Sequence, residues 1–222
     1  MNFDVSYFIA VFPQLLKYIP LTLMMAVVAM IVSIGLGFLI TLMKLSKFRI
    51  LNKIGNVYIS FFRGMPGLVQ LFLIFYGLPQ LFPVFKGISA VFAVILGLGF
   101  KNSAYLAEIF RSAILSVDKG QIEAGKSLKI SDWKIYVYIL LPQAFVNALP
   151  ATGNIFISLI KETSLAFALG ITEIFAEGKI IAGSSFRYLE TYLAVGIIYW
   201  GLVIVYSWLQ SLIERKVGVP YR

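Results

Sequence analysis

Ionisable side chains lie inside long apolar stretches of this sequence, where such groups are costly. Lys101 and Glu108 occupy one stretch, and Lys161 and Glu162 occupy another. A charged group at membrane depth faces the interior of a helix bundle or a water-filled path, so each of these residues predicts a binding or a pairing role. The chemistry on offer is recognition of a carboxylate or an ammonium group in place of water.

The polar residues of these stretches fall on shared helix faces, because positions three, four, seven or eight apart lie on one side of an α-helix. The residues that we expect to line a polar cavity are Gln70, Lys101, Asn102, Tyr105, Glu108, Asn154, Ser158, Lys161 and Glu162. A structural alternative stays open, in which the lysines pair with the glutamates across helices and fix the packing. Arg63 lies nearer one end of its stretch and is expected to anchor the backbone or a lipid headgroup.

Several kinds of chemistry are excluded by residues that the sequence lacks. It contains no cysteine and no histidine. Disulfides, iron–sulfur clusters, haem ligation by histidine, ordinary zinc catalysis and histidine-activated nucleophiles are therefore excluded. A membrane-embedded transferase would need paired carboxylates for a metal or a histidine base. Glu108 and Glu162 have no close carboxylate in sequence, so we expect no metal site and no catalytic residue.

The elements that position these residues are predicted to be membrane-spanning helices. The chain of 222 residues is 60% hydrophobic and 13% charged, whereas soluble domains are about 45–50% apolar and about 25% charged. A span needs roughly 20 apolar residues. Five spans are predicted at about 20–43, 56–78, 88–109, 146–169 and 192–213, the second interrupted by Arg-Gly-Met-Pro-Gly at 63–67. Residues 1–19 are predicted to form an interfacial helix rather than a removable signal peptide.

The distribution of basic residues predicts the orientation. Most of the 19 lysines and arginines fall after the first span, after the third span and at the C-terminus. Cytoplasmic loops carry the excess of positive charge. An all-α integral membrane protein with its N-terminus outside and its C-terminus in the cytoplasm is therefore expected.

The segment 111–142 is the one sizeable cytoplasmic loop that this topology predicts. Good helix formers at 121–129 follow a turn signal at 118–120, and Ser131 is a candidate N-cap for a further helix. Such a helix could dock on a cytoplasmic partner, or it could be an ordinary amphipathic connector. The candidate contact residues are Gln121, Glu123, Ala124, Gly125, Leu128, Lys129, Ile130 and Trp133.

The same loop resembles one in permeases of bacterial ATP-binding-cassette importers. Glu-Ala-Gly at 123–125 followed by Ile-Leu-Leu-Pro at 139–142 is similar to the Glu-Ala-Ala…Gly…Ile-x-Leu-Pro loop of that family. Further segments resemble its polar amino acid branch; they are Phe-Arg-Gly-Met-Pro-Gly-Leu-Val-Gln at 62–70, Ala-Tyr-Leu-Ala-Glu-Ile-Phe-Arg at 104–111 and Leu-Ile-Lys-Glu-Thr-Ser-Leu at 159–165. Two departures stand out: Gly125 replaces the second alanine, and Lys129 replaces a glycine that normally ends the helix in a left-handed turn.

The resemblance implies a single permease domain over 1–222 in a bacterial inner membrane, importing a polar amino acid by alternating access. It implies that the loop is a coupling helix held by a separate ATPase subunit, which binds ATP and Mg²⁺, so that this chain binds no cofactor itself. A second permease, identical or paralogous, is expected because five spans are too few to enclose a large path. A solute-binding protein outside the membrane and membrane lipid are the other expected partners, and nucleic acid is not. The alternative is a stand-alone secondary carrier, which would not copurify with an ATPase.

Overall fold

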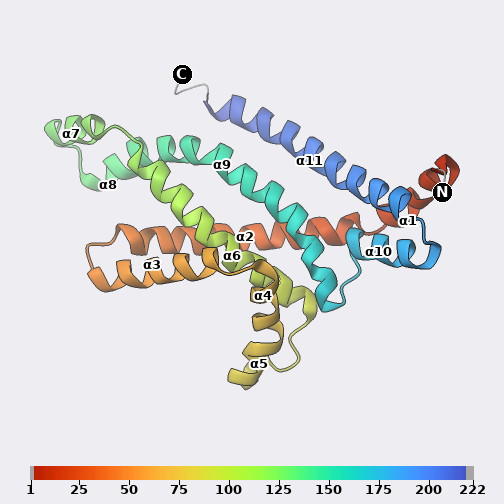
Figure 1. Ribbon diagram of the computed structural model, residues 1–222. Coiled ribbons are helices and arrows are strands. Elements are labelled where there is room, and N and C mark those ends of the chain that lie inside the picture. The colour runs from red at the N-terminus through yellow and green to blue at the C-terminus, as the bar shows by residue number, and fades with distance from the viewer. Residues whose placement is uncertain (1–2, 219–222) are drawn as a thin grey trace.

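The computed structural model describes residues 3–218, and within that range all regular structure is helical. Four helical runs within this range have the length and apolarity of membrane spans. They are α2 (Ile19–Leu45), α6 (Ala90–Leu115), the run Asp132–Leu169, and α11 (Tyr188–Gly218). A bent pair that includes α3 (Arg49–Gly64) raises the number to five within the described residues. The predicted all-α membrane fold is confirmed (Figure 1).

The second predicted span is bent rather than straight. The helix α3 begins at Arg49, seven residues before the predicted start, and runs back along α2. After Met65-Pro66 the chain turns by 110° into α4 (Gly67–Phe72). Proline cannot donate the backbone hydrogen bond that would continue α3, so the helix ends before it. The arm continues through a π-helical turn (Leu73–Gly77), α5 (Leu78–Leu81) and a 3₁₀ turn (Pro83–Phe85).

The helix α6 is the centre of the packing. Small residues let it approach α2 closely: a Cβ built on Gly37 would lie 2.9 Å from the Leu106 Cβ. Two hydroxyls of α2 donate to α6 carbonyls, Ser33 Oγ to Gly99 O at 3.1 Å and Thr41 Oγ1 to Ala107 O at 3.0 Å. Small residues and hydroxyls are what hold helices together in lipid, where apolar burial gives no net driving force.

The longest run is assembled from four pieces in sequence. They are α8 (Asp132–Ile135), a π-helical turn (Tyr136–Leu140), α9 (Leu141–Glu162) and the 3₁₀ segment η4 (Thr163–Leu169). Against α9 lies α11, whose Gln210 covers Gly153 so closely that a Cβ there would meet the side-chain amide at 2.1 Å. The Gln210 Nε2 donates to Glu214 Oε1 at 2.6 Å and to Pro150 O at 3.2 Å. This amide therefore joins the two helices.

The two ends of the molecule carry different short helices (Figure 1). Near one end lie α7 (Lys119–Ser127), α8 and the turn between α2 and α3. Near the opposite end lie α1 (Val5–Leu16), within the predicted N-terminal segment 1–19, and α10 (Ile174–Ser185), which the sequence analysis did not predict. Arg187 holds this second end together, because it pairs with Asp4 at 3.5 Å and with Glu190 at 3.2 Å.

Candidate functional site

Three of the predicted cavity residues form one network between α6 and the end of α9. The Lys101 Nζ donates to Glu162 Oε1 at 2.5 Å, and the Asn102 Nδ2 donates to Glu162 Oε2 at 3.0 Å. Both oxygens of the carboxylate are thus occupied. The charged side chains keep a fifth or so of their surface exposed, 17% for Lys101 and 23% for Glu162. The network is a partly accessible ion pair inside the membrane-spanning bundle.

Two helix breaks meet at this ion pair. On one side α9 gives way to the 3₁₀ segment η4 directly after Glu162. On the other side α4 begins at Gly67, where a Cβ would lie 3.5 Å from Lys101 Nζ and 3.4 Å from Leu165 Cδ1. In membrane transporters, substrate and ion sites are typically built from such discontinuous helices. The junction of α4, α6 and η4 is therefore the candidate site.

Gln70 stabilises the bend beside this junction. Its side chain is 2% exposed, and its Nε2 donates to Phe62 O at 2.9 Å and Met65 O at 2.8 Å. These carbonyls belong to the last turn of α3 and to its C-cap, groups that a helix end leaves without an intrahelical partner. The Nε2 is thus bound to the backbone of the bend, whereas the buried Oε1 has no hydrogen-bond partner in the described part of the chain, and the cavity-lining role of Gln70 stays a prediction.

Glu108 forms ion pairs with basic residues, as the structural alternative predicts. Its Oε1 accepts from Lys44 Nζ at 2.5 Å and its Oε2 from Arg111 at 2.9 Å. One turn earlier, Tyr105 lies under the Arg63 guanidinium, 5.2 Å from the ring centroid. Arg63 therefore contacts an aromatic face within the bundle. This part of the α6 face is thus held to α2 by the Lys44–Glu108 ion pair and to α3 by the contact between Arg63 and Tyr105.

The polar face of α9 is only partly covered. Asn154 and Lys161 are exposed and Ser158 is half-buried. Within residues 3–218 Lys161 forms no ion pair. A lysine in the middle of a bundle cannot face lipid without a large cost, so this stripe must face water or another subunit.

The predicted docking helix exists as α7, two residues earlier than expected. Asp118 caps it by accepting from Gly120 N at 2.8 Å. Lys129 adopts the left-handed conformation that a glycine usually supplies, with φ of 54°. Ile130 N then donates to Gly125 O at 3.1 Å and closes the turn. The departure at Lys129 thus leaves the turn geometry intact, at a cost of about 1–2 kcal/mol in backbone strain.

The loop divides into a buried side and an exposed side. Gly125 is buried against Ile135, to which a Cβ would come within 3.0 Å, and the Gln143 Nε2 donates to Gln121 Oε1 at 2.6 Å. Outward lie Glu123, Ala124 and Lys129, together with Leu128 at 74% exposed and Trp133 at 73%. Ile130 is half-buried. We call Glu123, Ala124, Leu128, Lys129 and Trp133 the α7 surface.

This combination of broken spans and an exposed helical loop is matched in known proteins. Residues 33–219 match the family described as binding-protein-dependent transport system inner membrane component. The chain belongs to this family. It is 54% identical over 219 residues to a probable amino-acid permease, YxeN, of Bacillus subtilis strain 168, covering 99% of this chain and 98% of that protein. It is 36% identical to the L-cystine transport system permease TcyL of the same organism, covering 97% and 92%.

One solved structure shares its fold with nearly the whole of this chain. The structure described as an amino acid ABC transporter with histidines superposes with a TM-score of 0.87 at 35% identity, covering 97% of this chain and 100% of the other. The family match therefore extends to the arrangement of the helices.

One segment of the chain has the residue spacing of a nucleotide-binding loop. Gly120 to Ser127 reads Gly-x-x-x-x-Gly-Lys-Ser, the spacing of a phosphate-binding loop. The spacing alone would allow a nucleotide-binding loop, contrary to the expectation from the family resemblance that this chain binds no cofactor. A phosphate loop is a turn whose free amides surround the anion. Here the same residues lie in or cap α7, Asp118 occupies its N-terminus, and Gly125 packs on Ile135, so the local structure offers no phosphate cradle.

Two residues that the sequence did not single out form carboxylate contacts: the half-buried Lys44 and the buried Glu173. Lys44 was assigned to a loop, yet it reaches Glu108 across 64 positions. Glu173, fully buried between η4 and α10, caps α10 by accepting from Ala176 N at 2.9 Å and accepts from the Tyr199 hydroxyl at 2.6 Å. Glu173 lay outside every predicted span, and its one signal was a carboxylate directly before an apolar helix start. Within residues 3–218 no cluster of acidic residues could hold a metal.

Proposed function

We propose that this chain is the permease subunit of an ATP-driven importer for a polar amino acid. The observation that carries the proposal is the exposed polar stripe of α9, Asn154, Ser158 and Lys161, which ends at the Lys101–Glu162 network. An amino acid carries one carboxylate and one ammonium group. A lysine and a carboxylate beside amide and hydroxyl groups can replace the water around both.

The substrate class is supported by what the relatives are named for. YxeN is described as a probable amino-acid permease, and TcyL as a permease of an L-cystine transport system. The route through the membrane would run along α9 and the α4–α6–η4 junction, shared with a second permease that covers the exposed stripe. Nine residues remain the proposed lining or support of that route: Gln70, Lys101, Asn102, Tyr105, Glu108, Asn154, Ser158, Lys161 and Glu162.

The energy would come from an ATPase subunit that docks on the α7 surface. The exposed Gln121 bonds to Gln143 of α9, Gly125 packs on Ile135 of α8, and the half-buried Ile130 closes the turn after α7, so movement of α7 would be transmitted through α8 into α9. ATP and Mg²⁺ would bind to that subunit, and a solute-binding protein would deliver the amino acid. The positive-inside rule supports α7 in the cytoplasm and the N-terminus outside the inner membrane, because Lys44, Lys47 and Arg49 lie at the same end as α7.

The deciding experiment compares Glu123→Arg with the unmodified chain in the copurified complex, reconstituted in proteoliposomes with binding protein. We expect hydrolysis of ATP to be stimulated by one amino acid in the unmodified complex and to lose that stimulation in the variant. Glu123 is exposed and caps no helix, so the variant should fold normally. Lys134→Glu, a charge reversal at another exposed position of the loop, serves as the control.

Failure has a clear form. If no ATPase copurifies, or if Glu123→Arg hydrolyses ATP with normal stimulation, the docking assignment is wrong and a stand-alone carrier describes the chain better.

A further inference from the structure

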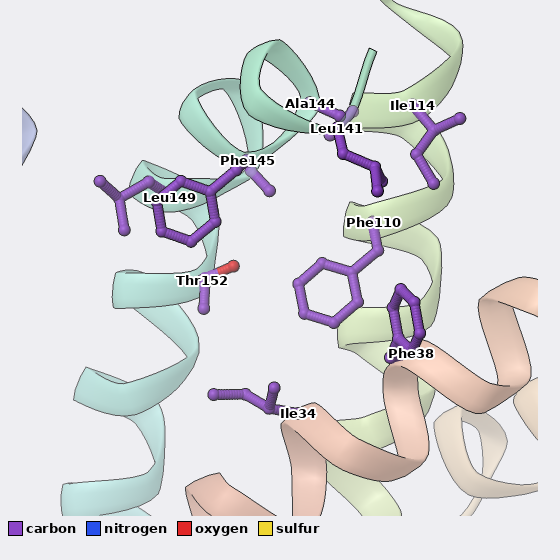
Figure 2. A pocket seen from close by; sticks show the side chains of 11 residues that line it. Ile34, Phe38, Phe110, Ile114, Leu141, Ala144, Phe145, Leu149 and Thr152 are labelled. Atoms are coloured by element: carbon purple, nitrogen blue, oxygen red, sulfur yellow. The ribbon is translucent and has the colours of Figure 1, made fainter. Parts of the chain in front are cut away.

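A cavity of about 350 Å³ lies between α2, α6 and the first half of α9, away from the ion-pair network (Figure 2). Its size falls within the range of about 300–1,000 Å³ that is usual for ligand sites. Phe38 of α2, Phe110 and Ile114 of α6, and Phe145 of α9 give the walls their bulk. The single hydroxyl among the lining residues is that of Thr152, which is buried without a hydrogen-bond partner in the protein.

The cavity faces away from the proposed transport route. Phe110 follows Lys101 by nine residues, which is about two and a half helical turns. It therefore lies on the side of α6 opposite to Lys101. That Lys101 faces the route rests on the proposed function, whereas the geometry of the two faces does not.

The surroundings of the cavity are those of bilayer hydrocarbon. Ile34, Phe38 and Phe145 are 41%, 44% and 58% exposed, and all three lie within membrane-spanning runs. Exposed apolar side chains in a membrane-spanning run are suited to contact with lipid tails, which are as apolar as they are. A void that opens toward lipid forfeits dispersion contacts on every wall unless lipid fills it.

The dimensions of the cavity match one half of a bilayer. Its α9 wall runs from Leu141 at the start of the helix to Thr152, eleven residues or about 17 Å at about 1.5 Å per residue. Half of the hydrocarbon thickness is about 15 Å. The α9 wall is therefore about as long as one half of the hydrocarbon layer is thick, which is the length that a lipid tail spans.

We propose that this cavity holds one acyl chain of a membrane phospholipid, lying between α2 and α9. The acyl chain fills the gap beside the half of α9 that connects the α7 surface to the Lys101–Glu162 network. The bilayer would then be part of the packing of the helix that is proposed to transmit movement.

The test counts phospholipids that stay bound to the intact complex in mild detergent, by native mass spectrometry. Ala148 lines the cavity and is 6% exposed, so Ala148→Phe fills the space that the tail would occupy. We expect this variant to retain about one phospholipid fewer per permease chain. Ala151→Phe is the matched control, because Ala151 lies on the same helix outside the cavity lining.

Thr152→Val distinguishes an acyl chain from a polar occupant. The two side chains have the same shape, and an acyl chain needs no hydrogen bond, so the lipid count should not change. Release of the bound species by Thr152→Val, an unchanged count in Ala148→Phe, or separation of the two permeases by Ala148→Phe would each overturn the proposal. Separation would identify a second copy as the occupant.

A second variant and a readout that does not depend on transport keep the test decisive. If Ala148→Phe does not fold and cannot be purified at all, the smaller Ala144→Leu fills the same cavity and is judged in the same way. The count is made per permease chain and needs neither a transported solute nor ATP hydrolysis, so it can succeed or fail separately from the proposed import function.

Discussion

Lys101 and Glu162 neutralise each other in a place where water is scarce. Each residue alone would be a costly charge among apolar neighbours, while the pair with Asn102 satisfies both carboxylate oxygens. The value of such a pair is seen when one partner is removed, because the other is then left as an uncompensated charge.

The first prediction concerns this pair. Lys101→Met leaves the Glu162 carboxylate without its cation, and we expect the free energy of unfolding to fall by about 1–3 kcal/mol. The measurement is the thermal midpoint of the solubilised chain. The double variant Lys101→Met with Glu162→Gln should recover part of the loss, since a neutral amide can still accept from Asn102. Additive losses in the double variant would contradict a direct interaction.

Glu173 gives a second prediction, in its dependence on pH. Burial raises the pKa of its carboxyl above the ordinary value of 4.5, although the Tyr199 hydroxyl and three backbone amides act in the opposite direction. The folded chain therefore holds this proton more tightly than the unfolded chain does. The stabilisation of the fold by the protonated Glu173 is fully present below the ordinary pKa, and it is lost as the pH rises through the raised pKa.

Replacing Glu173 by Gln removes the titration and keeps one acceptor oxygen for the Ala176 amide, while the new NH2 group can donate to the Tyr199 hydroxyl oxygen. We expect unfolding midpoints of the variant to decline less than those of the unmodified chain as pH is raised above about 4.5. Ser184→Ala, at an exposed position on the same helix, removes no ionisable group and is the comparison that should retain the original slope. Parallel slopes for all three proteins would show that Glu173 titrates normally.

At the scale of elements, α7 depends on one close contact. Gly125 packs on the flexible end of Ile135, at a distance that leaves room for little more than a methyl group. Alanine at this position would require Ile135 to yield by a few tenths of an ångström, whereas a larger side chain must lift α7 off α8. The element is thus positioned by the absence of a side chain.

The third prediction follows from this contact. Gly125→Leu should cost about 1–3 kcal/mol in local stability through overpacking, and should abolish substrate stimulation of ATP hydrolysis in the reconstituted complex. Ala124→Leu adds the same side chain to the exposed side, so the fold is expected to tolerate it. If both variants fold and Gly125→Leu couples normally, α7 does not transmit movement through α8.

At the scale of the whole molecule, the ends differ in charge and in the helices that they carry. The α2–α3 turn and α7 share one end with several lysines and arginines, while α1 and α10 form the other. The proposed orientation is therefore a property of the entire chain and can be tested at two distant points.

The fourth prediction uses the absence of cysteine from the sequence. In intact cells, a membrane-impermeant maleimide should label Lys179→Cys on α10, and should label Lys47→Cys only after permeabilisation. Both side chains are exposed, so accessibility within the protein does not limit either reaction. The reverse pattern would invert the proposed topology.

The long spans were predictable because apolar composition alone dictates them, and the stop at Pro66 followed from its missing N–H. The 110° angle was not predictable, since it depends on how Gln70 binds the two carbonyls at the bend. Pairing could be anticipated for Glu108 but its partner Lys44 could not, because helix packing decides which distant residues meet. The pattern at 120–127 shows the converse. Its residues match those of a phosphate-binding loop, but they form the helix α7 instead of a loop with free amides.

The contact between Gly153 and Gln210 has a consequence for how related sequences vary. The amide of Gln210 occupies the volume that any side chain at position 153 would need. A side chain at position 153 would therefore push the flexible end of Gln210 aside and break its hydrogen bond to the Pro150 carbonyl. Among homologues we expect alanine or larger residues at the first position only where the second has become short, so that these two sites, 57 positions apart along the chain, change together during evolution.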